Sequence, residues 1–219
     1  MVNGKTKLLA AHLCRKDKGK MVRIIDYKAG NAPSVLHAIN SLGYKAEFAQ
    51  NAGDLADATH IILPGVGSAG ATMDSLRETG LINALEDLVL NKKVPFFGIC
   101  VGMQILFEHS EEGDTKCLGW LKGRVVKFDT AKVRVPQMGW NKVHGENLGN
   151  HFYFVNSYYG VPQNESDIWG TADYNGKFTA AVHKGNIYGT QFHAEKSGNA
   201  GLKLLDRFLG STLVKKGQG

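Results

Sequence analysis

Four short apolar runs, separated by turn residues and helical patterns, fill the first half of the sequence. They cover residues 21–26, 44–49, 59–65 and 94–99. Continuous apolar runs of this length are typical of parallel strands that are buried on both faces. Helical patterns lie at 32–43, within 70–92 and over 101–110. This alternation predicts an α/β fold, a doubly wound and mostly parallel central sheet flanked by helices.

The second half of the sequence consists of short runs rich in Val, Tyr, Phe and Thr. These runs cover residues 123–128, 151–160, 167–174, 177–184 and 186–193. The dipeptides Asn175-Gly176 and Gly185-Asn186 separate the last three runs, and such dipeptides are typical of tight hairpin turns. We therefore expect an added antiparallel β region in the C-terminal half, followed by a helix over 197–210.

Length and charge favour one domain with a basic extension. The chain has 219 residues, 43% of them hydrophobic, and single α/β domains reach ~200–250 residues. Six basic residues against one aspartate in residues 1–20 account for five of the six net positive charges. The basicity therefore does not predict nucleic-acid binding by the domain. We expect a disordered extension at 1–20, the domain at 21–210 and a C-terminal tail at 211–219.

Nothing in the sequence predicts secretion or membrane insertion. No apolar run reaches the ~18 residues of a membrane span, and no signal-peptide pattern follows the N-terminus. The three cysteines, Cys14, Cys100 and Cys117, have neither disulfide-framework nor zinc-ligand spacing. A low and odd cysteine count fits a reducing compartment, so we expect a cytoplasmic protein that uses no metal and no cofactor.

The loop "GVGSAG" at 65–70 matches the glycine fingerprint of dinucleotide sites. It follows the third predicted strand instead of the first, and the acidic residue expected ~20 residues later at a strand end is missing. Glycines serve equally well to bring backbone N–H groups close to a small substrate. We therefore do not expect a nucleotide at this loop.

Cys100 lies between two glycines where an apolar run turns into a helical pattern, in "GICVG". This pattern has the form of a nucleophile elbow, the tight strand-to-helix turn that presents a reactive side chain at the sheet edge. A helix N-terminus also favours the thiolate form of a cysteine. The alternative is a small buried side chain, which is the usual role of a free cysteine. Cys117, in a polar loop without a nearby base, is interpreted as inert.

His193 and Glu195 follow the last predicted strand, two residues apart. Residues at i and i+2 of an extended chain share a face, so Glu195 is expected to orient His193. His193 is then available as the base for a thiolate from elsewhere in the fold. A histidine and a glutamate at a strand end are also common without any role.

Six motifs together make the chain resemble the class I, triad-type glutamine amidotransferases. They are "IIDYKAGN", "ILPGVGSAGATM", "FFGICVGMQILFEHSEEG", "VPQMGWN", "FYFVNSYY" and "QFHAEKSG". Within that family, the segments "PGVG" and "MGWN" make the chain resemble the glutaminase subunits of imidazole glycerol phosphate synthases. The resemblance covers about residues 21–210 and implies an enzyme that hydrolyses glutamine to glutamate and ammonia for histidine biosynthesis.

The resemblance also implies a role for each residue that matches a motif. Cys100, His193 and Glu195 would form the triad. The oxyanion hole would be formed by Val66, Gly67 and Val101. The residues that would bind glutamine are Gly67, Gln104, Glu112, Asn156, Ser157 and Tyr158. The partner would be a cyclase subunit of (β/α)8-barrel fold, forming a heterodimer with this chain through Asn31, Trp140, Tyr153 and Lys196.

The sequence departs from the family's commonest pattern at a few positions, and three alternatives remain open. Gln137 and Asn156 replace usual histidines, Ala194 replaces a usual proline, and Lys28-Ala29 replaces a glycine-led pair. One alternative is a paralogous glutaminase that supplies ammonia to a sugar-aminating synthase of surface polysaccharide synthesis. The others are an inactive subunit that only binds a partner and a cysteine peptidase of similar fold.

Overall fold

The computed structural model describes residues 19–27 and 31–210. Residues 1–18 of the expected extension, the dipeptide Lys28-Ala29 and the expected tail at 211–219 lie outside the described residues. The described residues therefore include nearly all of the domain predicted at 21–210.

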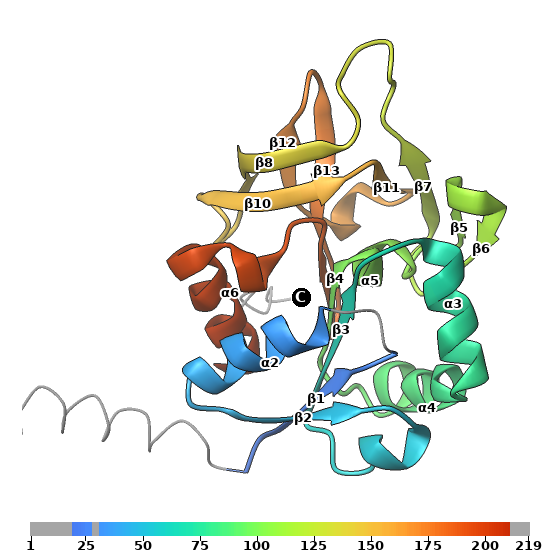
Figure 1. Ribbon diagram of the computed structural model, residues 1–219, viewed down its shortest axis with the longest axis vertical. Helices are drawn as coiled ribbons and strands as arrows, with labels where there is room; N and C mark the ends of the chain where they lie inside the picture. Colours follow the sequence, from blue (N-terminus) through green and yellow to red (C-terminus); the bar gives the residue numbers. More distant parts are fainter. Residues whose placement is uncertain (1–18, 28–30, 211–219) are drawn as a thin grey trace, which may run out of the picture.

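A central sheet of eight strands organises the domain (Figure 1). Across the sheet, the strands are β2 (Lys45–Ala49), β1 (Met21–Ile25), β3 (His60–Gly65), β4 (Phe96–Cys100), β14 (Ile187–Thr190), β13 (Lys177–Lys184), β12 (Ile168–Asp173) and β9 (His144–Gly145). The first five are parallel to one another, and the pairs from β14 to β9 are antiparallel. The predicted mostly parallel sheet with an antiparallel addition in the C-terminal half is confirmed.

Helices cover both faces of the parallel strands, as a doubly wound sheet requires. Figure 1 shows α2 (Ala32–Ser41) and α6 (Gly198–Gly210) on one side, with α3 (Ala69–Glu78) and α4 (Leu81–Glu86) on the other. A single π-helical turn, Asp87–Asn91, extends α4, and the short α5 (Val101–Gln104) follows β4 directly. No helix in the described part of the chain is long and apolar enough to cross a membrane.

Two small sheets lie beyond the carboxyl ends of the parallel strands (Figure 1), one antiparallel and one mixed, because β5 pairs with β7 in parallel. One pairs β8 (Gln137–Lys142) with β10 (His151–Asn156). The other contains β11 (Tyr158–Pro162), β7 (Gly123–Lys127), β5 (His109–Ser110) and β6 (Thr115–Lys116). Because ligands of open α/β sheets bind outside the carboxyl ends of the strands, these units form the upper wall of any site there.

The prediction of a helix over 101–110 is correct for its first turn and wrong beyond it. It ends at Gln104, and residues 109–110 form β5. The carbonyls of residues 105–107 instead accept hydrogen bonds from the backbone N–H groups of Leu118, Leu121 and Gly119. These contacts with a distant loop replace the next helical turn. The run at 151–160 is likewise not one strand, because it breaks at Ser157 into β10 and β11, which belong to different sheets.

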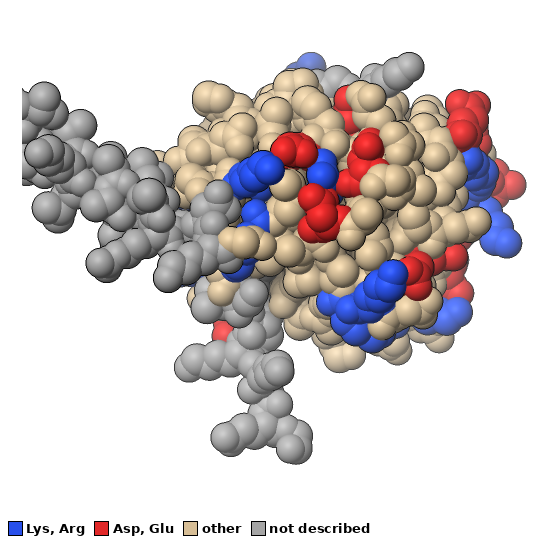
Figure 2. Space-filling model, turned by 90° about the horizontal axis from the view of Figure 1, so that it is seen from below, with Lys and Arg blue, Asp and Glu red and all other residues tan. Residues whose placement is uncertain are grey.

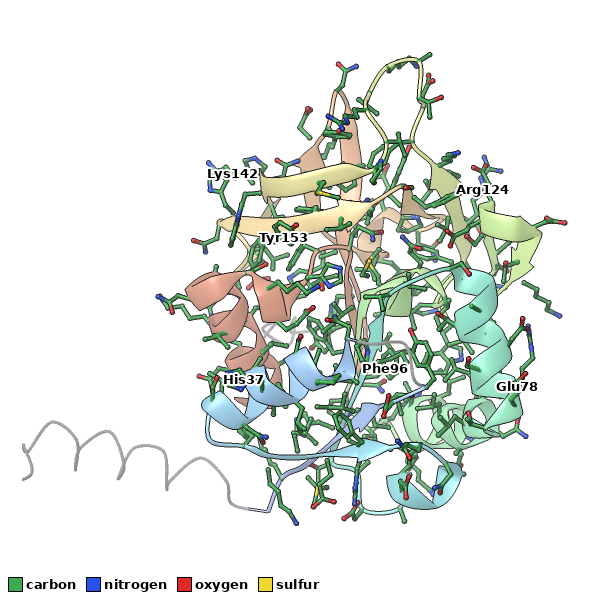
Figure 3. All side chains as sticks on the ribbon, viewed as in Figure 1. His37, Glu78, Phe96, Arg124, Lys142 and Tyr153 are labelled. Atoms are coloured by element: carbon green, nitrogen blue, oxygen red, sulfur yellow. The ribbon has the colours of Figure 1, made fainter. Side chains whose placement is uncertain are left out.

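The core is most densely buried around β3 and β4. Every residue of both strands is buried, and Phe96, labelled near the centre of Figure 3, is fully inaccessible to solvent. Its ring packs edge-on against Trp120 at a centroid distance of 5.3 Å. Burial on both faces holds the carboxyl end of β4 rigidly, and Cys100 is the last residue of that strand.

Charges of both signs are mixed on the face of the molecule seen in Figure 2. Lysines and arginines lie next to aspartates and glutamates on this face. Arg23, for example, forms ion pairs with Glu47 and Asp57, each at 2.8 Å. This arrangement agrees with the single net positive charge that the sequence leaves for residues 21–219.

Candidate active site

Cys100 lies at a strained turn between β4 and α5. Its backbone has φ 56° and ψ −111°, a conformation that a residue with a side chain rarely adopts. Gly98 and Gly102 are required beside it, because a Cβ on Gly98 would overlap the Gly102 backbone and one on Gly102 would overlap the Leu63 carbonyl. The geometry is that of a nucleophile elbow, as the glycine spacing predicts.

His193 and Glu195 follow β14, which lies beside β4 in the sheet. The His193 Nδ1 and the Glu195 Oε1 are 2.8 Å apart, and the His193 side chain is 3% exposed. The predicted contact between the two side chains is present, although the expected reason for it is wrong. Strand β14 ends at Thr190, and a 3₁₀ turn over Ala194–Lys196 brings the carboxylate back to the imidazole.

The electrostatics of this pair favour the charged forms of both residues. Burial lowers the pKa of His193, but hydrogen bonds and negative charge from Cys100 and Glu195 outweigh it and raise the pKa to about 9. Burial alone would raise the pKa of Glu195, yet hydrogen bonds from His193 and Asn31 hold it below its usual value. An imidazolium next to a carboxylate and a sulfur is the arrangement that supports a thiolate nucleophile.

The sulfur of Cys100 has two further polar neighbours. Its thiol donates to the Val155 carbonyl at 3.8 Å, and the side-chain amide of Gln191 donates to the sulfur at 3.6 Å. Cys117, by contrast, is buried, and burial raises its pKa to about 11. This fits the interpretation of Cys117 as unreactive.

A cavity of about 310 Å³ opens beside the sulfur. Its lining includes every residue that the resemblance implies for the triad's nucleophile and base, the oxyanion hole and glutamine binding, namely Cys100, His193, Val66, Gly67, Val101, Gln104, Glu112, Asn156, Ser157 and Tyr158. Residues from five separate parts of the chain thus meet at one cavity. Their individual roles stay predictions.

Several of the lining side chains are already held by hydrogen bonds. The Gln104 amide donates to the Tyr158 carbonyl at 3.2 Å, and the Glu112 carboxylate accepts the backbone N–H of Ala69 at 2.8 Å. The Asn156 amide also donates to the Tyr158 carbonyl, whereas its Oδ1 is buried and has no hydrogen-bond partner among the described residues. An unpaired buried acceptor in a cavity wall is suited to a donor group on a ligand.

The residues expected at the partner interface do not all lie on the surface. Trp140 is 58% exposed, Lys196 is exposed, and Tyr153, labelled on β10 in Figure 3, contacts the Trp140 ring at 6.0 Å between centroids. Asn31 is only 5% exposed, and its amide donates to the Glu195 carboxylate at 2.6 Å. In the isolated chain Asn31 therefore contacts the triad.

The sequence reasoning missed Gln191, Val155 and Pro136 as members of the site. Gln191 lies two residues before His193, inside the "QFHAE" motif, and this spacing was the available signal. Nothing in the local pattern marks Val155 or Pro136, since their proximity depends on how β8 and β10 are placed. Among the described residues there is no group of three or more His, Cys, Asp or Glu side chains that could hold a metal ion.

Comparison with known proteins agrees with this geometry. Residues 23–211 match the family model described as "Glutamine amidotransferase class-I". Solved structures share the fold at lower identity: a glutamine amidotransferase with a TM-score of 0.72 at 21% identity covers 87% of this chain and 98% of the other. PurLQS from Thermotoga maritima gives 0.71 at 19%, covering 88% of this chain and 99% of the other. The chain belongs to the class I glutamine amidotransferase family.

Curated relatives narrow the placement within the family. The protein named imidazole glycerol phosphate synthase subunit HisH in Leptospira interrogans is 42% identical over 86% of this chain and 98% of its own length. A protein of the same name in Rhodopirellula baltica is 44% identical over 86% and 96%. The longer chloroplastic hisHF of Arabidopsis thaliana is 41% identical over 86% of this chain and 34% of its own length. The chain is thus similar to HisH subunits over nearly all of the described domain.

Proposed function

We propose that this chain is the glutaminase subunit of an imidazole glycerol phosphate synthase in histidine biosynthesis. It hydrolyses glutamine to glutamate and ammonia at the cavity beside Cys100. The single observation that carries the proposal is a cavity lined by Cys100 and by His193, which Glu195 contacts, in a chain about 42% identical to HisH subunits. This combination favours an enzyme over an inactive binding subunit, and a histidine-pathway subunit over a sugar-amination paralogue.

In the first half of the reaction the Cys100 thiolate attacks the side-chain carbonyl carbon of glutamine. The carbonyl π electrons move to the oxygen, and backbone N–H groups of Val101 and of the 66–67 segment stabilise this oxyanion. As the tetrahedral intermediate collapses, the C–N bond breaks and the His193 imidazolium gives its proton to the departing nitrogen. Ammonia leaves, and a γ-glutamyl thioester remains on Cys100.

In the second half of the reaction, neutral His193 takes a proton from a water molecule that attacks the thioester. The C–S bond then breaks, which releases glutamate and restores the thiolate and the imidazolium. Glu195 remains ionised throughout and orients the imidazole, because hydrogen bonds hold its pKa below the usual value.

The cavity offers complementary groups for each end of glutamine. We assign Glu112 to the α-ammonium, and the unpaired Oδ1 of Asn156 to an N–H group of the substrate. Gln104, which cannot ionise, suits the neutral side-chain amide. Gly67, Ser157 and Tyr158 would complete the wall around the substrate, since they also line the cavity.

A partner subunit would receive the ammonia, which would otherwise become ammonium in water and lose its nucleophilicity. We propose a heterodimer with a cyclase of (β/α)8-barrel fold, a domain that needs ~250 residues of its own. The exposed Trp140 with Tyr153 and Lys196 would contact it, and Asn31 would join the contact beside the triad. Both subunits would work in the cytoplasm.

The Val66–Gly67 peptide is the element that partner binding would act on. Gly67 has φ +96°, and no atom lies within 4 Å of the position of an added Cβ. A side chain there would therefore act through backbone strain and not through a clash. We propose that this peptide points away from the oxyanion in the resting enzyme and that the partner shifts its population.

Gly67→Ala tests this switch, since alanine restricts the conformations that the peptide can reach. The stimulation of ammonia release by the partner should fall by about tenfold or more, while a matched Gly149→Ala variant, also open around its Cβ, keeps it. Full stimulation in Gly67→Ala would contradict the switch.

The glutaminase assignment itself is tested by glutamate release from glutamine. Cys100→Ala should abolish it, and Cys117→Ala should retain it, because Cys117 lies outside the cavity lining. Release that survives Cys100→Ala would overturn the assignment, and cleavage of peptides instead of glutamine would move the chain to the peptidases.

A further inference from the structure

Gln191 is a buried polar residue that contacts the nucleophile and has no role in the chemistry above. It is fully inaccessible to solvent, and its backbone N–H donates to the Ala180 carbonyl of β13 at 2.9 Å. Its side-chain Nε2 donates to the Cys100 sulfur at 3.6 Å. The backbone hydrogen bond and the burial fix the position from which this side chain reaches the sulfur.

The orientation of the Gln191 amide is set by Gln104. The Gln104 Nε2 donates to the Gln191 Oε1 at 3.0 Å, so the oxygen of Gln191 is already occupied on that side. The Nε2 of Gln191 must then point the other way, toward the sulfur. A continuous chain of side chains therefore runs from the cavity wall, through two amides, to the nucleophile.

The two polar neighbours of the sulfur favour opposite protonation states. The Val155 carbonyl can accept a proton from the thiol, and its negative end repels a thiolate. The Gln191 N–H can donate to the sulfur and stabilises the thiolate. The charge of this sulfur also helps to raise the pKa values of His193 and Tyr27, and Glu112 and Lys196 line the same cavity. Without Gln191, the Val155 carbonyl would remain, and it would favour the thiol form of Cys100 over the thiolate.

We propose that Gln191 is a positioning residue that holds the Cys100 sulfur as a thiolate aligned for attack and connects it to Gln104 in the substrate cavity. The inference deepens the proposed glutaminase site and rests on it. It assigns a function to the first residue of the "QFHAE" segment, which otherwise contributes only its histidine and glutamate. A substrate that contacts Gln104 would therefore affect the position of the Cys100 sulfur through the side-chain amide of Gln191.

Alkylation of Cys100 by iodoacetamide, followed across pH, measures the thiolate directly and needs no glutamine. A Cys14→Ser background removes the thiol at position 14, and Cys117 stays protonated over most of the range because its pKa is about 11. Gln191→Met keeps the length of the side chain but removes both amide hydrogens. We expect the midpoint of the alkylation profile to rise by about one pH unit, as loss of a hydrogen bond to a charged group predicts.

Gln163→Met is the matched control, since Gln163 is exposed and lies outside the cavity, and its midpoint should equal that of the parent. His193→Ala separates the two hypotheses. A shift in His193→Ala without one in Gln191→Met overturns the role of Gln191 and leaves the triad standing. The absence of a shift in both overturns the triad and the role of Gln191 together.

A second measurement uses the unchanged side chains and so does not depend on the folding of a variant. The side-chain amide proton resonances of Gln191 should move with pH at the same midpoint as the alkylation of Cys100. Resonances that stay fixed through that midpoint would show that the amide does not sense the sulfur, and would overturn the proposal.

Discussion

At the scale of single residues, the site depends on a few charges that the fold isolates from water. Glu195 and Cys100 together raise the pKa of a buried histidine from its ordinary 6.5 to about 9. The protonated form of His193 is therefore favoured by folding. Its contribution to stability is fully present below about pH 6.5 and is lost as the pH rises through about 9.

Glu195→Gln should shift the basic limb of the glutaminase pH profile. In the parent protein kcat/KM should fall as the pH rises through about 9, because His193 must carry the proton that the leaving ammonia takes. The variant lacks the carboxylate charge, so its basic limb should move to lower pH and its kcat should fall by about 10²–10⁴-fold.

Steady-state glutamate release between pH 6 and pH 10.5 measures both effects. Glu165→Gln is a suitable control, because Glu165 is exposed and is not one of the residues that line the cavity. A basic limb at the same pH in Glu195→Gln would contradict the account of the charge pair.

At the scale of elements, the close approach of α5 to β3 and β4 decides where the nucleophile lies. Gly102, in α5, lies against the Leu63 carbonyl of β3 at a distance that leaves no room for a Cβ. Helix α5 is only one turn long and its position depends on this contact. Packing of backbone against backbone, and not helix propensity, therefore holds the elbow.

Gly102→Ala should destabilise the domain by about 1–3 kcal/mol, the usual cost of overpacking a buried site. Gly149→Ala, which has open space around the new methyl group, should change the stability by less than about 0.5 kcal/mol. Urea unfolding followed by tryptophan fluorescence compares the two. Equal midpoints for both variants would contradict the claim that α5 is held by this approach.

The sequence predicted the elements that are governed by local pattern and missed those that depend on distant contacts. The buried strands β3 and β4 and the hairpin at Asn175-Gly176 could be predicted because period, composition and turn residues all agree. The premature end of α5 and the separation of β10 from β11 could not, because loop residues 118–121 and a neighbouring sheet supply their hydrogen bonds.

The same distinction applies to the site. The triad was predictable because each member lies in a motif with its own spacing. Val155 contacts the sulfur because the fold places β10 beside the elbow, which a linear pattern does not express, whereas Gln191 lies in the same motif as His193 and its spacing was a signal. The expected surface position of Asn31 is likewise changed by packing, since α2 brings its amide to Glu195.

At the scale of the whole molecule, one apolar surface stands out for docking. Met138 and Trp140 lie two residues apart on the exposed side of β8, and they are 67% and 58% exposed. Strand β8 lies beyond the carboxyl ends of the parallel strands (Figure 1), and Pro136, the residue before it, lines the cavity. Large exposed apolar side chains close to a reaction site are typical of contact with another subunit.

Trp140→Ala should weaken binding to the cyclase subunit by at least about tenfold, as truncation of an aromatic hot spot does. Val161→Ala is the control, because Val161 is also an exposed apolar residue, 40% accessible, but lies on β11. Isothermal titration of each variant with the cyclase gives the dissociation constants, and unfolding midpoints check the fold. The same affinity in Trp140→Ala as in the parent would place the interface elsewhere.

The central claim is that a Cys-His-Glu triad in this chain makes ammonia for a histidine-pathway partner. The most direct test measures glutamate production by the purified protein, first alone and then with the cyclase subunit and its ribonucleotide ligand. The account predicts a large stimulation that disappears in Cys100→Ala. Basal glutaminase activity without any stimulation by the cyclase would contradict the histidine assignment and point to a sugar-aminating synthase as the partner.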